Sequence, residues 1–144
     1  MKRQSHILSG MVLGMSLALA VGLAQAQTGS DVVNVKVPFA FNIGAQTFPA
    51  GEYSLKPLLP HTMLLRNEAG QTLTNINANS VESREVQKAA KLVFNEYGGR
   101  YFLAQIWRAD DNIGEELIKS RAEIEVARKH VPGQQIALRV LAHR

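Results

Sequence analysis

The sequence contains no cysteine among its 144 residues. Disulfide bonds, thiol catalysis and lipid attachment through a cysteine are therefore excluded. A domain that works in an oxidising compartment without disulfides must be held together by packing alone. Aromatic residues are also few, with one tryptophan, three tyrosines and five phenylalanines. The positions of these rings therefore carry much of the information about the core.

A large excess of one charge is lacking as well. The chain has 16 lysines and arginines against 12 aspartates and glutamates. Lys2 and Arg3 belong to the N-terminal leader described below, and without them 14 basic residues face 12 acidic ones. A nearly balanced charge does not favour binding to a polyanion. We therefore expect no nucleic-acid partner.

The usual signatures of catalysis are missing too. After the leader there is no Gly-x-Ser-x-Gly motif of the kind that presents a nucleophilic serine. His61, His130 and His143 are far apart in the sequence, whereas zinc sites usually have two closely spaced ligands. We therefore expect no catalytic residues, no zinc site and no cofactor.

Residues 1–26 have the features of a secretory signal peptide. Lys2 and Arg3 are followed by an uncharged apolar stretch over residues 7–24, and Ala24 and Ala26 are small at the positions that a signal peptidase recognises. Cleavage after Ala26 leaves residues 27–144, a length that suits one domain. The alternative is an uncleaved membrane anchor. With cleavage, we expect a periplasmic or secreted protein without an integral membrane segment.

Alternating apolar residues predict a half-buried strand over residues 33–43. Pro38 cannot donate to a neighbouring strand, so it places this strand at an edge or at a bulge. Gly44-Ala45 is typical of a tight hairpin turn that sets Phe41 opposite Phe48. A proline–glycine turn follows at 49–51, and then a second, weaker strand begins.

A second hairpin is predicted around residues 67–70, where asparagine begins a four-residue turn and glycine ends it. That turn would set Leu64 opposite Leu73. Residues 80–88 are polar and without a period, which indicates a loop or one helical turn.

The stretch 91–107 holds five of the nine aromatic residues. Gly98-Gly99 at its centre favours a type I′ turn, which needs positive φ at both positions. One face of this hairpin is clearly apolar, and the other is mixed, as expected when a helix or a partner covers it. That mixed face, together with Trp107, is our candidate binding surface. The turn pairs Tyr97 with Arg100, Glu96 with Tyr101, Asn95 with Phe102, Phe94 with Leu103, Val93 with Ala104, Leu92 with Gln105, Lys91 with Ile106 and Ala90 with Trp107.

Two interpretations of the candidate surface remain open. Aromatic side chains in the strands of a small domain without disulfides usually form its core, because each buries a large area. Phe94, Leu103 and Trp107 are expected inside on this ground. Tyr97, Arg100 and Phe102 could instead form an exposed face that holds a ligand or a partner, and Trp107 could contribute to it.

An acidic turn follows at residues 109–116. Its hard oxygen ligands make it a candidate calcium site, although the glycine is misplaced for an EF-hand loop and a solvated turn is the alternative. A short strand is expected at 116–119. The candidate calcium ligands are Asp110, Asp111, Asn112 and Glu115.

The end of the chain predicts a helix and a final strand. Ser120 and Glu123 have the spacing of a capping box, in which the serine accepts from the backbone and the glutamate reaches back. The helix would run over residues 121–130, with Ile124, Ala127 and Val131 on its buried side. Alternation in "EIEVAR" leaves a strand as the alternative. Apolar residues at every second position predict the last strand over 136–140.

Taken together, these segments predict a mainly β domain. About eight short strands form an antiparallel meander, closed into a small sandwich or barrel, and one C-terminal helix precedes the last strand.

Four segments together resemble an uncharacterised family of small exported bacterial proteins. They are "VPFAFNIG" at 37–44, "FPAGEY" at 48–53, "LVFNEYGGRYFLAQIW" at 92–107 and "KSRAE" at 119–123. The resemblance covers most of the chain after the leader. It implies an exported β-rich domain and carries over no activity, cofactor or site residue.

We therefore expect an exported, non-catalytic binding or interaction module. It would act through the Tyr97–Arg100–Phe102 face or through a sheet edge, on a protein or small-molecule partner that the sequence does not identify. One alternative is a carrier of a small apolar ligand inside a barrel. Another is a hydrolase of unknown substrate.

Overall fold

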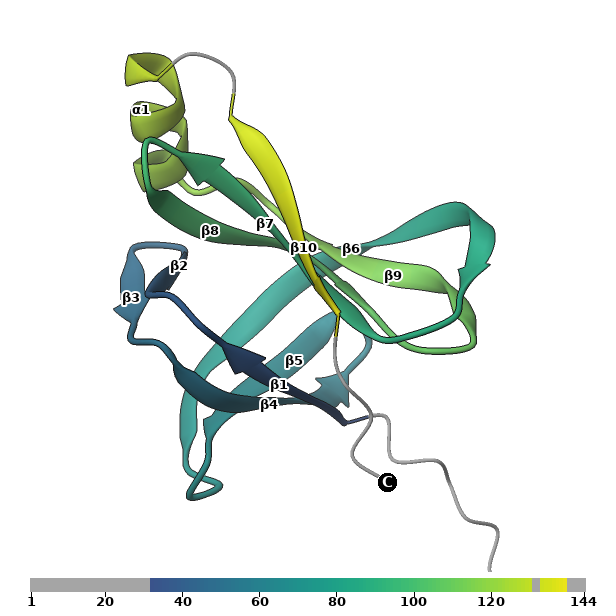
Figure 1. Ribbon diagram of the computed structural model, residues 1–144. Helices are drawn as coiled ribbons and strands as arrows, with labels where there is room; N and C mark the ends of the chain where they lie inside the picture. Colours follow the sequence, from purple (N-terminus) through teal and green to yellow (C-terminus); the bar gives the residue numbers. More distant parts are fainter. Residues whose placement is uncertain (1–31, 131–132, 140–144) are drawn as a thin grey trace, which may run out of the picture.

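A computed structural model describes residues 32–130 and 133–139, so the predicted signal peptide lies outside the described residues. One helix and ten strands follow one another along the chain (Figure 1). Their bounds are β1 Val33–Val37, β2 Phe41–Ile43, β3 Gln46–Phe48, β4 Gly51–Leu59, β5 Thr62–Asn67, β6 Thr72–Gln87, β7 Lys91–Tyr97, β8 Arg100–Trp107, β9 Asp111–Leu117, α1 Arg121–Lys129 and β10 Gln134–Arg139.

The mainly β fold with one C-terminal helix before the last strand is confirmed. Eight of the ten strands form one hydrogen-bonded path in the order β1-β4-β5-β6-β9-β8-β2-β3; β7 branches from it at β8, and β10 pairs with β7. Among the described strands the two ends of this path do not pair, so the sheet is not closed. Most neighbours are antiparallel, but β2 runs parallel to β8, which an antiparallel meander did not predict. Figure 1 shows the long β6 leaving the lower strands and continuing into the upper ones.

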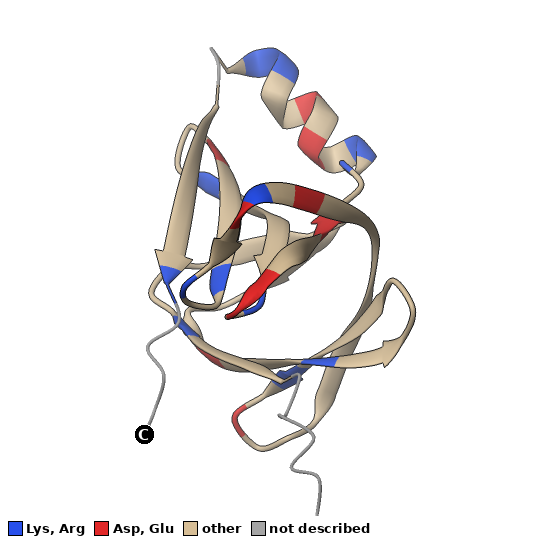
Figure 2. Ribbon diagram, turned by 90° about the vertical axis from the view of Figure 1, so that its right-hand side faces the viewer, with Lys and Arg blue, Asp and Glu red and all other residues tan. Residues whose placement is uncertain are grey.

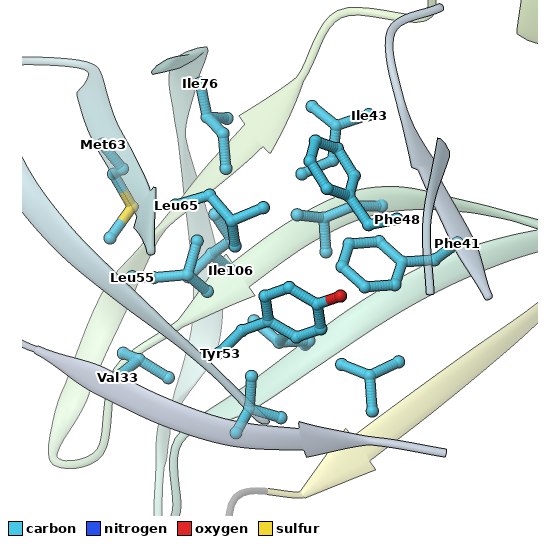
Figure 3. Close-up of a cluster of buried hydrophobic side chains, with 14 of the residues drawn as sticks. Val33, Phe41, Ile43, Phe48, Tyr53, Leu55, Met63, Leu65, Ile76 and Ile106 are labelled. Atoms are coloured by element: carbon cyan, nitrogen blue, oxygen red, sulfur yellow. The ribbon is translucent and has the colours of Figure 1, made fainter. Parts of the chain in front are cut away.

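A single main core fills the space between the lower strands β1, β4 and β5 and the upper strands β2, β7 and β8. Side chains from both groups meet there, and Tyr53 lies edge-on to Phe41 with its ring centroid 5.2 Å away (Figure 3). The buried members are Val33, Val35, Val37, Phe41, Ile43, Phe48, Tyr53, Leu55, Met63, Leu65, Ile76, Leu92, Phe94, Leu103 and Ile106.

The strand predicted over 33–43 is two strands, so that prediction was wrong in its extent. The chain leaves the β conformation at Pro38 and resumes it at Phe41. β1 pairs with β4, whereas β2 pairs with β3 and β8. Between them Phe39 stacks on Tyr101 with ring centroids 3.9 Å apart. Apolar residues alternate with others through both strands because β1 and β2 face the same core, although they belong to different parts of the sheet.

The first and the third hairpin form at the predicted turns. Phe41 lies opposite Phe48 as expected. Gly98 and Gly99 both have positive φ, at 56° and 82°. The predicted register holds from this turn as far as Phe94 and Leu103 and then shifts by one residue, because Ala104 forms a bulge. Beyond that bulge the observed pairs are Val93 with Gln105, Leu92 with Ile106 and Lys91 with Trp107, which corrects the predicted register.

The second hairpin has a different register from the predicted one. Leu64 lies opposite Asn75 instead of Leu73. Backbone hydrogen bonds from the Asn67 and Gly70 amides close the turn at Asn67 and Gln71, so three residues lie between the strands instead of the predicted four. Leu73 is left as the extra residue of a bulge, and its side chain is 38% exposed.

Residues 80–87 form a strand, which corrects the predicted loop. They belong to the second half of β6, which pairs with β9 in an arm that extends away from the core (Figure 1). Their polar composition fits this position, because this part of the arm is largely exposed to solvent. β9 begins at Asp111, so the acidic turn is confined to Ala109 and Asp110, and the strand predicted over 116–119 was misplaced.

Candidate functional site

Of the two hydrogen bonds in the predicted capping box, only the one to the Ser120 side chain forms at the start of α1. The Ser120 hydroxyl accepts a hydrogen bond of 3.1 Å from the Glu123 amide, as predicted. The Glu123 carboxylate does not reach back to the start of the helix. It turns under the helix and is only 4% exposed. The buried side of α1 therefore consists of Glu123 and Val126. Ala127 is partly buried beside them, as predicted, but Ile124 is exposed, so that part of the prediction was wrong. Val131 lies outside the described residues.

A network of polar side chains ties α1 to the sheet. The Asn95 amide donates to Glu123 Oε1 at 2.8 Å, and the Tyr97 hydroxyl donates to the same oxygen at 3.2 Å. Lys119 Nζ donates to the Tyr97 hydroxyl at 3.3 Å, and the Gln135 amide donates to Asn95 Oδ1 at 3.3 Å. A buried carboxylate is costly unless it is hydrogen-bonded, and here two side chains of β7 supply its partners.

His130 at the end of α1 and Gly133 just before β10 lie directly against the β7–β8 hairpin. A Cβ on Gly98 would lie 2.4 Å from the His130 ring, and a Cβ on Gly133 would lie 2.5 Å from the Tyr97 ring. The His130 ring is held by a contact of 2.9 Å between its Nδ1 and the Val126 carbonyl oxygen. Because glycine has no Cβ, the backbone at Gly98 can approach the His130 ring and the backbone at Gly133 can approach the Tyr97 ring.

These contacts place most of the predicted binding face in the interior. Tyr97 and Phe102 are 6% and 2% exposed and pack with Val126 in a small second core. Arg100 alone is exposed, with its guanidinium 5.5 Å from the Phe102 ring centroid. Figure 2 shows the covering helix with basic residues at its two ends and acidic residues between them. The mixed composition of the hairpin face reflects cover by a helix, which was one of the two predicted explanations.

Trp107 is also buried, at 5% exposure. Its ring lies on β9, where a Cβ on Gly114 would come within 2.6 Å of it. The indole Nε1 donates to Gln105 Oε1 at 3.0 Å, and Lys91 Nζ lies 5.6 Å from the ring centroid. Trp107 therefore serves the packing of β8 against β9 and the adjoining end of β7.

The four candidate calcium ligands do not converge on one point. The Asp111 carboxylate accepts from the Ile113 amide at 2.9 Å and lies 3.8 Å from Arg108 Nε. Asn112 donates to Glu82 Oε1 at 3.2 Å. Glu115 points to His61, and Asp110 has the positive φ of a turn residue. Within residues 32–130 and 133–139 no group of three or more His, Asp or Glu side chains is arranged to hold a metal ion.

Ser80, His61 and Glu115 are brought together although nothing in their sequence spacing indicated it. The Ser80 hydroxyl lies 3.3 Å from His61 Nδ1, and Glu115 Oε2 lies 3.8 Å from the same nitrogen. In a nucleophile–base–acid triad the serine and the carboxylate use opposite nitrogens of the imidazole. Both groups here approach Nδ1, so this arrangement cannot relay a proton from Ser80 to Glu115.

An open surface cleft lies between the β3–β4 connection and the β5–β6 turn. Its volume is about 350 Å³, at the lower end of the range for ligand sites. Its apolar lining consists of Phe48, Pro49 and Leu73, and its polar lining includes Glu52, Asn67 and Glu68.

The walls of this cleft are held in place by hydrogen bonds. The Tyr53 hydroxyl donates to the Pro49 carbonyl oxygen at 2.5 Å, and burial raises the pKa of this hydroxyl above the ordinary value of 10.0. On the other wall Asn67 bonds Gln71 twice through its side chain, each time at 2.9 Å. The sequence predicted both turns but not the bulge that brings Leu73 to the surface between them.

Comparisons with protein-family models, with curated proteins and with solved structures found no match. Within the described part of the chain, no helix has the length and apolar character that a membrane-spanning helix needs.

Proposed function

We propose that this protein is an exported, non-catalytic binding module. The observation that carries the proposal is the open cleft of about 350 Å³ beside strands with free backbone edges. Apolar clefts with a few converging polar groups are the usual places where small groups of a partner bind. The signal-peptide pattern of residues 1–26 supports export to the periplasm or beyond the cell.

Free strand edges adjoin the cleft. Among the described strands β3 pairs with β2 alone. Gly51 and Glu52 of β4 pair with β1, but the pairing of β4 with β5 begins only at Tyr53 and Asn67. Exposed edges hydrogen-bond readily to an added strand. An extended peptide could therefore use backbone hydrogen bonds at an edge and place a side chain in the cleft.

We also infer that the strands form an open sandwich. The lower group of β1, β4 and β5 and the upper group of β2, β7 and β8 contribute to one core, which favours two packed layers. A carrier with an interior cavity is less well supported, because the described inner side chains pack against one another. A hydrolase is less well supported because Ser80, His61 and Glu115 lack the geometry of a triad.

Native mass spectrometry of residues 27–144, purified gently from the exporting cell, tests the proposal. The variant Leu73→Lys places a positive charge in the cleft, and Val86→Lys makes the same change at an exposed position on the β6–β9 arm. We expect an additional bound mass that Leu73→Lys loses and Val86→Lys retains. A bound mass that survives Leu73→Lys would contradict a binding site in this cleft.

A further inference from the structure

We propose that the cleft between the β3–β4 connection and the β5–β6 turn receives a lysine or arginine side chain of an extended peptide. This inference rests on the proposed function and names the chemistry of the ligand. It is carried by the arrangement of apolar and acidic groups around the cleft.

The charged groups of the cleft have one sign. Glu52 and Glu68 line it from opposite walls, and the described residues that line it include no lysine or arginine. Both glutamates are exposed and form no ion pair among the described residues. Lys36 lies opposite Glu52 on the neighbouring strand β1, but no salt bridge joins them. Two carboxylates without partners therefore face the space that a ligand would enter.

The floor of the cleft suits the stem of a long basic side chain. Phe48, Pro49 and Leu73 supply apolar surface. Lysine and arginine bury their methylene groups on such surfaces while the charged end stays near water or an anion. An aliphatic side chain would contact only the apolar residues of the cleft, and an acidic side chain would be repelled by Glu52 and Glu68. The cleft therefore favours a cationic side chain over both.

The free edges nearby favour a peptide over a free amino acid. β3 ends at Phe48, and the part of β4 with Gly51 and Glu52 projects beyond the pairing with β5. A strand laid along either edge gains backbone hydrogen bonds and fixes which side chain enters the cleft. A single exposed ion pair contributes little, so most of the affinity must come from these additional contacts.

The test uses three five-residue peptides, acetyl-Thr-Val-X-Val-Thr-amide, in which X is lysine, norleucine or glutamate. Each is titrated into residues 27–144 at low salt, and backbone amide shifts are followed by NMR. We expect the lysine peptide to shift the amides of residues 48–53 and 67–73 and to bind more tightly than the norleucine peptide. Glu52→Gln and Glu68→Gln should each weaken its binding roughly two- to five-fold, and Glu125→Gln on the exposed side of α1 should not.

The outcomes separate the two proposals. Equal binding of all three peptides in the cleft would overturn the preference for a cation and leave the binding module in place. Lysine binding that Glu52→Gln and Glu68→Gln do not weaken would also overturn it. If no peptide shifts the amides of the cleft at millimolar concentration, peptide binding at this site is contradicted. Weaker lysine binding at 0.5 M salt would agree with the ion pairs, because salt screens exposed charges.

Discussion

The side-chain amide of Asn95 on β7 lies 2.8 Å from Glu123 Oε1 on α1, and both residues are buried. This hydrogen bond links two residues that are 28 positions apart in the sequence. Val126 is the one buried apolar residue on the same side of the helix. Docking of α1, and with it the cover over Tyr97 and Phe102, therefore depends strongly on one buried carboxylate.

Replacement of Glu123 by alanine should destabilise the protein by about 2–3 kcal/mol, because hydrogen bonds to charged groups are strong and their partners would be left unsatisfied. Urea unfolding measures this change. Glu125→Ala is the control, since Glu125 is exposed on the same helix and the two variants share the same change in helix propensity. Equal effects of the two substitutions would contradict the role assigned to Glu123.

The two glycines of the β7–β8 turn should respond differently to alanine. Gly99→Ala should cost about 1–2 kcal/mol, because its φ is 82° and the space around it is open. Gly98→Ala should cost about 1 kcal/mol more, because the added methyl group meets the His130 ring. Thermal unfolding compares them, and His130→Ala should abolish the difference. A lower cost for Gly98 than for Gly99 would count against the close approach of α1.

Gly114 is the best position at which to probe the packing of β9. Gly114→Ala should destabilise the protein by about 1–3 kcal/mol, because its Cβ would lie within 2.6 Å of the Trp107 ring. Trp107 is the only tryptophan, so its fluorescence reports the displacement directly. We expect a red-shifted emission maximum with a lower unfolding temperature. An unchanged spectrum and an unchanged unfolding temperature would show that the ring does not rest on β9.

Tyr53 should make stability sensitive to alkaline pH. Burial raises the pKa of its hydroxyl above 10.0 in the folded protein, so the folded state favours the protonated form. This contribution is fully present below pH 10 and is lost as the pH rises through the higher folded pKa. The stability advantage of the wild type over Tyr53→Phe should therefore shrink between pH 8 and pH 11 in denaturant titrations. A constant advantage across that range would contradict this assignment.

Sequence patterns predicted those parts of the fold that local chemistry determines. Gly98-Gly99, Gly44-Ala45 and Ser120 each act within a few residues, and each forms the expected turn or cap. Bulges at Leu73 and Ala104 were missed because each adds one residue that the partner strand leaves unpaired. The position of such a residue depends on how the two strands pair, and no local pattern in the sequence indicates it.

Tertiary contacts overrode two local patterns. The polar run from Ser80 to Gln87 forms a strand because β9 pairs with it, not because it has a buried face. Glu123 has the spacing of a capping residue, but Asn95 and Tyr97 hold its carboxylate beneath the helix. The cleft lies between two turns whose positions were predicted, but their proximity depends on the pairing of β4 with β5 and on the bulge at Leu73. Neither can be read from the sequence alone.

Site-specific photocrosslinking in the exporting cell tests the central claim most directly. A photoreactive amino acid is placed at Leu73 in the cleft, at Arg100 on the hairpin, or at Val86 on the arm, which are all surface positions. We predict a discrete crosslinked product from position 73 alone, which Glu52→Gln together with Glu68→Gln weakens. A product from position 100 with none from position 73 would contradict the claim and would place binding at the hairpin beside α1.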